Sequence, residues 1–142
     1  MHLVAAPSFL IREDVPNDWA YIQESWLNSY RSSARAQDTG DVYMRQHKAL
    51  IRRILDTQDV VVRVAHVPEH VDAILGFLVA TATRPHVLHY VFVRQGARRT
   101  GIARALLGYL PSEALDYTHR PMRQNGPMNL PAQWRYNPYR LP

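Results

Sequence analysis

The feature that most constrains this chain is an apolar stretch that gives way to a small-residue turn and then to a second apolar stretch. Residues 87–93 read Val-Leu-His-Tyr-Val-Phe-Val, which predicts a β-strand. Residues 98–103 read Arg-Arg-Thr-Gly-Ile-Ala, and the next four residues continue as Arg-Ala-Leu-Leu until Pro111 stops the run. The apolar spacing from Ile102 to Leu107 predicts a short helix. The sequence therefore predicts a strand, a loop and a helix in immediate succession.

The loop of this motif has the form R-x-x-G-x-A. Small residues leave successive backbone N–H groups unobstructed, and a helix start adds unpaired N–H groups and the positive end of the helix dipole. These properties predict a cradle for a pyrophosphate group, formed by the backbone from Arg98 to Ala103. The alternative interpretation is a plain strand-to-helix turn in which Gly101 permits tight packing.

Charge is distributed unevenly along the chain. The formal net charge is +5, and of 17 basic residues only Lys48 is a lysine. No Asp or Glu occurs between Ala73 and Ser112, whereas five arginines do: Arg84, Arg94, Arg98, Arg99 and Arg104. Because guanidinium groups form forked, charge-assisted bonds to phosphate, an anionic ligand is expected here. A phosphorylated cofactor and a nucleic-acid backbone bound by this basic face both fit.

Length and composition exclude several classes of protein. A chain of 142 residues has the size of a single domain, spanning residues 1–142, with a core of its own. The absence of cysteine excludes disulfides, thiolate zinc sites and a cysteine nucleophile. The seven histidines show no spacing that would bind a metal on one helix face, so no metal is expected. No segment has the length of a membrane span, and we expect a cytoplasmic protein.

Apolar periodicity predicts the order of elements along the chain. The expected elements are a strand at 9–12, helices at 14–31 and 41–55, a strand hairpin at 60–67 and 74–83 with a bulge near Gly76, the strand at 87–93, the helix from 102, and a last strand near 115–120. Five prolines follow Tyr117. They exclude a long helix, and we expect residues 121–142 to form an extended, docked arm anchored by Trp134, Tyr136 and Tyr139.

This order, the motif at 87–107 and the opening Phe9-Leu10-Ile11-Arg12-Glu13-Asp14 resemble the GNAT (N-acetyltransferase) superfamily. The resemblance implies an α+β, three-layer fold with a mixed, mostly antiparallel central sheet flanked by helices. More narrowly, the chain is similar to small GNAT-like proteins of bacteriophages through the segments 25–31, 89–93, 118–120 and 136–139. The proline-rich tail departs from the superfamily, in which many members place a tyrosine general acid on a last helix.

The resemblance implies transfer of an acetyl group from acetyl-CoA, or a related acyl-CoA, to an amine. A DNA base, a protein amine, an antibiotic and a small metabolite all stay open as the acceptor, as does the oligomeric state. The implied cofactor residues are Val91, Phe92 and Val93 on the strand, which would supply an N–H donor to the thioester oxygen, and Arg98, Arg99, Thr100, Gly101, Ile102, Ala103 and Arg104 in the loop and helix start.

Proton transfer and acceptor binding have their own candidates. His119 is the first candidate for moving the proton, since an imidazole titrates near neutral pH, and Tyr90 is the second. A structural histidine and a core tyrosine are the alternatives. Trp26, Tyr30 and His47 are expected to wall the acceptor pocket, or else to be core residues.

A second class of function stays open from the sequence alone. A GNAT fold without catalysis could dock on nucleic acid or a protein. Stacking would come from the tail aromatics, and phosphate contacts would come from the interleaved Arg135 and Arg140.

Overall fold

The computed structural model describes residues 8–31, 41–83, 86–110, 115–118, 130–137 and 140–141. The elements are β1 (Leu10–Glu13), the short 3₁₀ helix η1 (Pro16–Asp18), α1 (Trp19–Arg31), α3 (Asp41–Asp56), β2 (Val60–Val67), β3 (His70–Thr81), β4 (Val87–Val93), the 3₁₀ helix η2 (Gln95–Ala97), α4 (Ile102–Leu107), β5 (Asp116–Tyr117) and β6 (Arg135–Tyr136).

A single six-stranded sheet with the order β1-β2-β3-β4-β5-β6 organises the molecule. Strands β1 to β4 are antiparallel neighbours, whereas β5 runs parallel to β4 and β6 parallel to β5. The sheet is therefore mixed and mostly antiparallel, which confirms the expected fold class.

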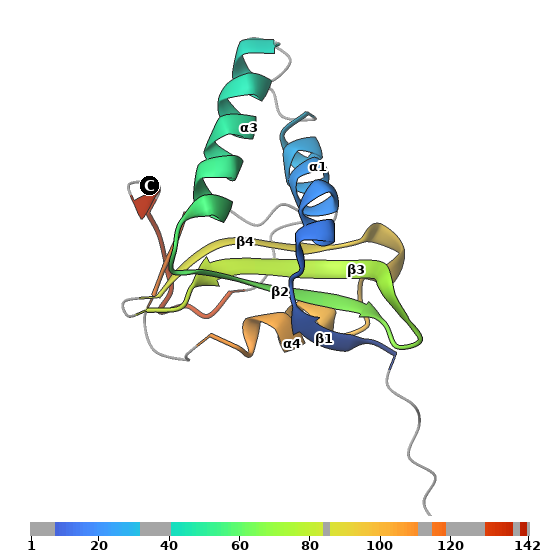
Figure 1. Cartoon of the computed structure of the whole chain (residues 1–142). Helices are drawn as coiled ribbons and strands as arrows, with labels where there is room; N and C mark the ends of the chain where they lie inside the picture. Colours follow the sequence, from blue (N-terminus) through green and yellow to red (C-terminus); the bar gives the residue numbers. More distant parts are fainter. Residues whose placement is uncertain are drawn as a thin grey trace, which may run out of the picture.

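Helices cover both faces of this sheet (Figure 1). Helices α1 and α3 stand on one face, and α4 lies on the other. Because successive side chains of a strand point to opposite faces, Tyr90 and Phe92 of β4 join the core under α1 and α3, while Val91 and Val93 join the core over α4. Burial on both faces explains the nearly continuous apolar sequence of β4.

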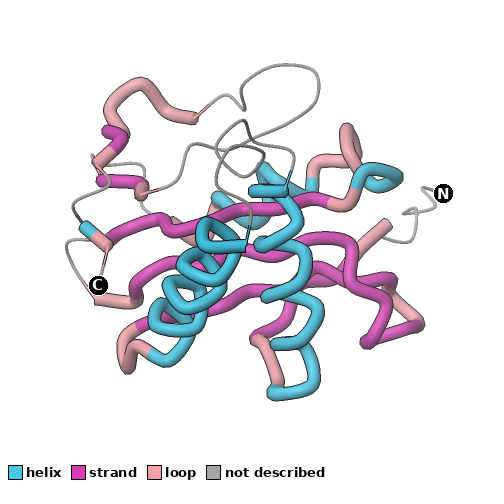
Figure 2. The backbone as a smooth tube through the Cα atoms, turned by 90° about the horizontal axis from the view of Figure 1, so that it is seen from above, coloured by secondary structure: helices cyan, strands magenta, loops and turns pink. Residues whose placement is uncertain are grey.

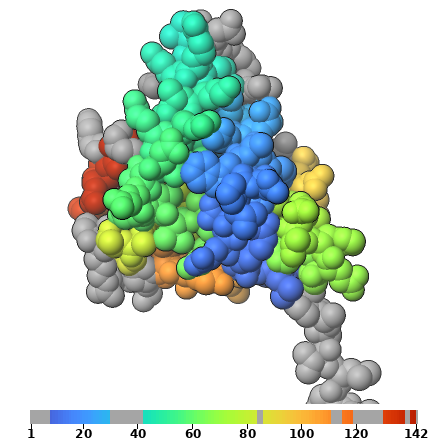
Figure 3. All heavy atoms as spheres, in the orientation of Figure 1, coloured from blue at the N-terminus to red at the C-terminus, as the bar shows by residue number. Residues whose placement is uncertain are grey.

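Helices α1 and α3 cross the sheet side by side when the molecule is viewed from above (Figure 2). Their buried residues recur at three- and four-residue spacing: Ile22 and Trp26 of α1 and Ile51, Ile54 and Leu55 of α3 are at most 5% exposed. The space-filling view shows the side chains of the two helices meeting above the sheet (Figure 3). The predicted amphipathic helices are thus confirmed as the layer on this face.

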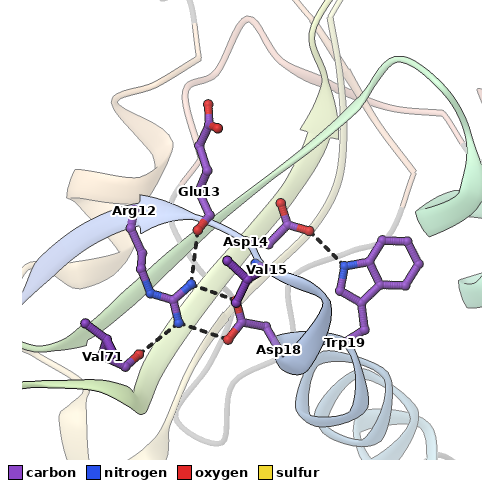
Figure 4. Close-up of polar contacts among 7 residues, drawn as sticks. All are labelled: Arg12, Glu13, Asp14, Val15, Asp18, Trp19 and Val71. Atoms are coloured by element: carbon purple, nitrogen blue, oxygen red, sulfur yellow. Dashed lines mark hydrogen bonds and ion pairs between the residues drawn. The ribbon is translucent and has the colours of Figure 1, made fainter.

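The connection from β1 to α1 is held by buried Asp18 (Figure 4). Its carboxylate accepts two hydrogen bonds from the Arg12 guanidinium, at 2.7 and 2.9 Å, and one from the Val15 N–H at 2.8 Å. Arg12 also donates to the Val71 carbonyl at 2.8 Å, which joins β1 to the start of β3. Burial raises the pKa of Asp18, but the hydrogen bonds and the nearby positive charges lower it by more, so the net shift is downward.

Several boundaries differ from the sequence expectation. β3 begins at His70 rather than Ile74, and β5 comprises Asp116–Tyr117. Residues 119 and 120 of the strand expected near 115–120 lie outside the described residues. The bulge near Gly76 is confirmed, since Ala65 pairs with Gly76 and His66 with Ile74, which leaves Leu75 as the extra residue.

The tail contributes a strand that the sequence analysis did not predict. β6 pairs with β5, and Trp134 beside it is 6% exposed in the core over α4. Ladder hydrogen bonds run from Arg135 N–H to Leu115 and from Asn137 N–H to Tyr117. Prolines nearby argued against regular structure, but none lies within β6 itself. Residues 119–129, 138–139 and 142 lie outside the described residues, so the extended arm as a whole stays a prediction.

Candidate functional site

A β-bulge interrupts β4 at His89. Val79 of β3 pairs with Tyr90, but the next β3 residue, Ala80, pairs with Leu88, which leaves His89 as an extra residue. Bulges bend a strand and change which groups face each side of it. The bulge lies at the centre of the strand that the sequence analysis placed in the site.

Beyond the bulge, the backbone of Val91 and Val93 points away from β3. The Arg94 N–H donates to the Leu75 carbonyl at 2.7 Å, so Arg94 and Leu75 form a hydrogen-bonded pair of the antiparallel ladder. Such pairs alternate with pairs whose backbone groups point outward, and Val93 and Val91 take those outward positions. Their N–H groups therefore face the β5 side of β4.

On the β5 side, the described residues leave these positions of β4 without a paired strand. β5 pairs with β4 only at Val87 and Leu88, and the last bond is from the Thr118 N–H to the Leu88 carbonyl at 3.0 Å. No described residue pairs with the rest of β4 on that side, although β3 stays paired through Val93 on the other. Among the described residues, β4 and β5 thus pair at two positions only, and the outward N–H groups of Val91 and Val93 lie along the gap beyond them.

The loop between β4 and α4 adopts the left-handed conformation twice. Arg99 has φ 68° and Gly101, the residue before α4, has φ 88°. A Cβ placed on Gly101 would meet no protein atom within 4 Å, so packing does not require a glycine there. The reason for glycine is therefore its backbone conformation, which residues with a Cβ adopt only at a cost.

The first turn of α4 presents unpaired donors. Within the described residues, no acceptor lies in hydrogen-bonding position for the backbone N–H groups of Ile102, Ala103 and Arg104. The side chains of Arg99 and Arg104 are exposed beside them. This combination of backbone donors and guanidinium groups suits a phosphate or pyrophosphate group.

Arg98 points back toward β4. Its Nε donates to the Val93 carbonyl at 3.1 Å, so its side chain lies at the end of the open β4 edge. Its charge also acts on the Tyr90 phenol. Arg98 therefore joins the loop after β4 to the strand, a link that the sequence analysis did not foresee.

Tyr90 is packed under α1. Its ring stacks on Trp26, and its hydroxyl bonds with the Ser29 side chain, which in turn donates to the Trp26 carbonyl at 2.6 Å. Burial raises the pKa of Tyr90, against smaller lowering effects from Ser29 and Arg98. The phenol therefore stays protonated, which suits a hydrogen-bond donor or an acid rather than a base.

The remaining predicted residues lie in different surroundings. Trp26 has no exposed surface, so it can shape an acceptor pocket only through its neighbours. His47 is half-buried on α3, with Nδ1 2.9 Å from the Tyr43 carbonyl and its ring 4.0 Å from the Tyr43 ring centroid. His119 and the side chain of Tyr30 lie outside the described residues.

Two further residues at this site were missed. His89 and Thr118 are buried and bonded to each other, and neither was a candidate. The signal available was a histidine alone in an otherwise apolar and aromatic strand. In the described ranges, no group of His, Asp and Glu side chains could hold a metal ion. No described helix is long and apolar enough to cross a membrane.

Comparisons with known proteins match this geometry at the level of the fold. No family model matches the chain, and no curated protein does. Among solved structures, an acetyl transferase of Pyrococcus furiosus superposes with a TM-score of 0.59 at 19% identity, covering 71% of this chain and 70% of that one. A histone acetyltransferase HPA2-related protein of Corynebacterium glutamicum gives 0.55 at 18% identity, covering 72% and 69%.

A GNAT-family acetyltransferase of Staphylococcus aureus gives a TM-score of 0.51 at 13% identity, covering 70% of this chain and 86% of that one. At identities this low, the TM-scores show a shared architecture and nothing more. The chain has an α+β GNAT-like fold.

Proposed function

We propose that this protein is an N-acetyltransferase that uses acetyl-CoA, or a related acyl-CoA, and an amine acceptor. The observation that carries the proposal is the parting of β4 from β5, with the outward N–H groups of Val91 and Val93 along the gap. At the start of α4, further N–H groups have no acceptor among the described residues. A long ligand with a thioester at one end and a pyrophosphate at the other matches this sequence of donors.

Different residues of the chain would bind different parts of the acyl-CoA. Val91 and Val93 would donate N–H groups to the thioester oxygen and to the pantetheine arm, with Phe92 between them. The stretch from Arg98 to Arg104 would hold the pyrophosphate through backbone N–H groups, with the guanidinium groups of Arg99 and Arg104 neutralising charge. Bound acetyl-CoA supplies an acetyl group on a good leaving group, so the protein has to position the amine and accept one proton.

Two residues are proposed for the proton. His119 follows Thr118 directly in the chain, and Thr118 is bonded to β4 where the gap begins. The His119 imidazole would accept the proton of the attacking amine. Tyr90, kept protonated by burial, would instead donate a proton to the departing thiolate.

The acceptor would be bound on the side of α1 and α3. Tyr30 and His47 are proposed to contact it, with Trp26 supporting them from the core. The narrower resemblance to bacteriophage proteins, the single domain over residues 1–142 and the cytoplasmic location stay predictions.

For the second candidate, a nucleic-acid-binding module, one of the three stacking residues is not available at the surface, whereas Tyr136 is 40% exposed. Trp134 is buried, and Tyr136 lies against Tyr117 with ring centroids 5.8 Å apart. Both Arg135 and Arg140 lie within ion-pair distance of Asp116, at 3.7 and 3.5 Å. These groups serve the β5–β6 connection, and Tyr139 lies outside the described residues. Acyl transfer is therefore favoured over nucleic-acid binding.

The test compares two glycines of the same loop. Asparagine tolerates the left-handed conformation, so Gly101→Asn adds a side chain beside the cradle without strong backbone strain. Gly96→Asn is the matched control, because Gly96 is exposed and equally open but has no positive φ. Acetyl-CoA affinity is measured by calorimetry, and unfolding by melting with and without ligand.

We expect the Gly101 variant to fold and to bind acetyl-CoA about tenfold more weakly, a loss of about 1.4 kcal/mol, with the Gly96 variant close to wild type. Equal affinity of both variants would mean that the loop is only a turn. DNA binding that persists in saturating acetyl-CoA and falls steeply with salt would favour the binding module instead.

A further inference from the structure

Two buried polar side chains meet where β4 and β5 part. His89 of β4 is 3% exposed and Thr118, just after β5, is 2% exposed. The His89 Nδ1 lies 3.0 Å from the Thr118 Oγ1. The same two segments are joined by the bond from the Thr118 N–H to the Leu88 carbonyl. Side chain and backbone together thus tie the two strands at their last shared point.

His89 is also the residue that shifts the register of β4. Before the bulge, the Leu88 carbonyl faces β5, and after it the backbone groups of Val91 and Val93 do. An unbulged strand alternates with a period of two, so the outward positions after Leu88 would be Tyr90 and Phe92. The extra residue therefore decides which N–H groups face the gap.

A polar pair at this point is not needed for burial. Replacing two hydrogen-bonded partners by apolar groups of the same shape is often nearly neutral for stability, whereas removing one partner is costly. Neighbouring positions of β4 are filled by Leu88, Tyr90 and Val91. A hydrogen bond fixes the relative orientation of its two partners, which an apolar contact does not. A bulge that stays at one position of a strand requires such a fixed orientation.

We propose that the His89–Thr118 hydrogen bond is a positioning device for the acyl-donor site: it holds the bulge and the end of β5 so that the N–H groups of Val91 and Val93 face the gap. This role rests on the proposed function. His89 and Thr118 act through the strand and do not touch the ligand.

The test uses isosteric variants and two probes. Thr118→Val keeps the shape of the side chain and removes the hydroxyl, whereas Thr118→Ser keeps the hydroxyl and is the matched control. The probes are CoA, which has both a nucleotide and a pantetheine arm, and ADP, which has the adenosine and pyrophosphate but neither the 3′-phosphate nor the pantetheine arm. Calorimetry gives both affinities, and amide hydrogen exchange reports on Val91 and Val93.

We expect Thr118→Val to weaken CoA binding about tenfold and to leave ADP binding unchanged, with faster exchange at Val91 and Val93. Thr118→Ser should stay near wild type. A merely structural role would alter both probes alike or neither, and that result overturns the proposal. If Thr118→Val does not fold, Thr118→Ala, which also removes the hydroxyl, should show the same selective loss.

CoA binding by the wild-type protein distinguishes a failure of the proposed function from a failure of this positioning role. Failure of the wild-type protein to bind CoA overturns the proposed function and this role together. Wild-type CoA binding combined with an unchanged CoA affinity in the folded variants overturns this role alone.

Discussion

Trp26 of α1 and Tyr90 of β4 stack nearly parallel, with ring centroids 4.7 Å apart and planes inclined by 10°. The stack joins the helix layer to the strand that carries the outward N–H groups. Since Val91 directly follows Tyr90, the stack lies one residue away from the first of these N–H groups.

The first prediction separates the two interpretations of Tyr90. Tyr90→Phe keeps the stack and removes the hydroxyl bonded to Ser29, so we expect a loss of about 1 kcal/mol in the free energy of unfolding and unchanged acetyl-CoA affinity. Turnover with an identified amine decides the role. A fall of about a hundredfold or more assigns Tyr90 as the acid, and an unchanged rate assigns it to the core.

Trp26→Leu serves as the control for that experiment, because it removes the stack and leaves the Tyr90 hydroxyl in place. It should cost several times more stability than Tyr90→Phe, since Trp26 is fully buried. A Trp26 variant as stable as wild type would contradict the packing described here.

The second prediction concerns pH. The folded-state pKa of Asp18 lies below its unfolded value, so its contribution to stability is present above the unfolded pKa of about 4 and is lost as pH falls through the folded value. Urea unfolding should therefore show stability falling in acid. Asp18→Asn should lose about 1–3 kcal/mol at neutral pH and show a weaker acid dependence.

Glu13→Gln is the matched control for Asp18. Glu13 also forms an ion pair, with Arg63 at 2.8 Å, but its side chain is 75% exposed. An exposed pair contributes about 0–1 kcal/mol, so the Glu13 variant should stay close to wild type. Equal losses in the two variants would show that burial of Asp18 does not matter.

The third prediction concerns the close approach of β3, β4 and α4 at Gly76. A Cβ there would lie 2.5 Å from the Phe92 carbonyl oxygen and 3.2 Å from the Ile102 Cγ2. Backbone has to move to make room, so Gly76→Ala should cost about 1–3 kcal/mol and weaken acetyl-CoA binding by displacing α4. Gly96→Ala, with open space, should change stability by less than about 0.5 kcal/mol.

The fourth prediction opposes stability and binding at Arg99. A non-glycine residue in the left-handed region, such as Arg99, costs about 1–2 kcal/mol, and a glycine avoids this cost. Part of that gain is cancelled, because glycine raises the conformational entropy of the unfolded chain. Arg99→Gly should therefore raise the free energy of unfolding by about 0.5–1 kcal/mol while lowering acetyl-CoA affinity. Arg99→Lys, which keeps charge and strain, should leave stability unchanged. A gain in both properties would remove Arg99 from the phosphate site.

Local sequence was sufficient for the elements whose signal lies within a few residues. The apolar run of β4, the apolar spacing of α1 and α3, and the glycine before α4 are all features of residues close together in the chain. The order of these elements followed from them, whereas the mixed, mostly antiparallel sheet was implied by the resemblance to the GNAT superfamily. The loop from Arg98 to Arg104 could be predicted for the same reason, because a glycine such as Gly101 readily adopts the left-handed conformation.

Tertiary structure decided what depends on partners far apart in the chain. β6 exists because Arg135 and Tyr136 find an open edge on β5, which outweighs the prolines around them. The bulge at His89 has no local signature, because it is defined by the register of β3 on one side and by Thr118, 29 residues away, on the other. Composition and periodicity predict that β4 is a strand, but only its two neighbours determine which of its N–H groups are left facing the gap.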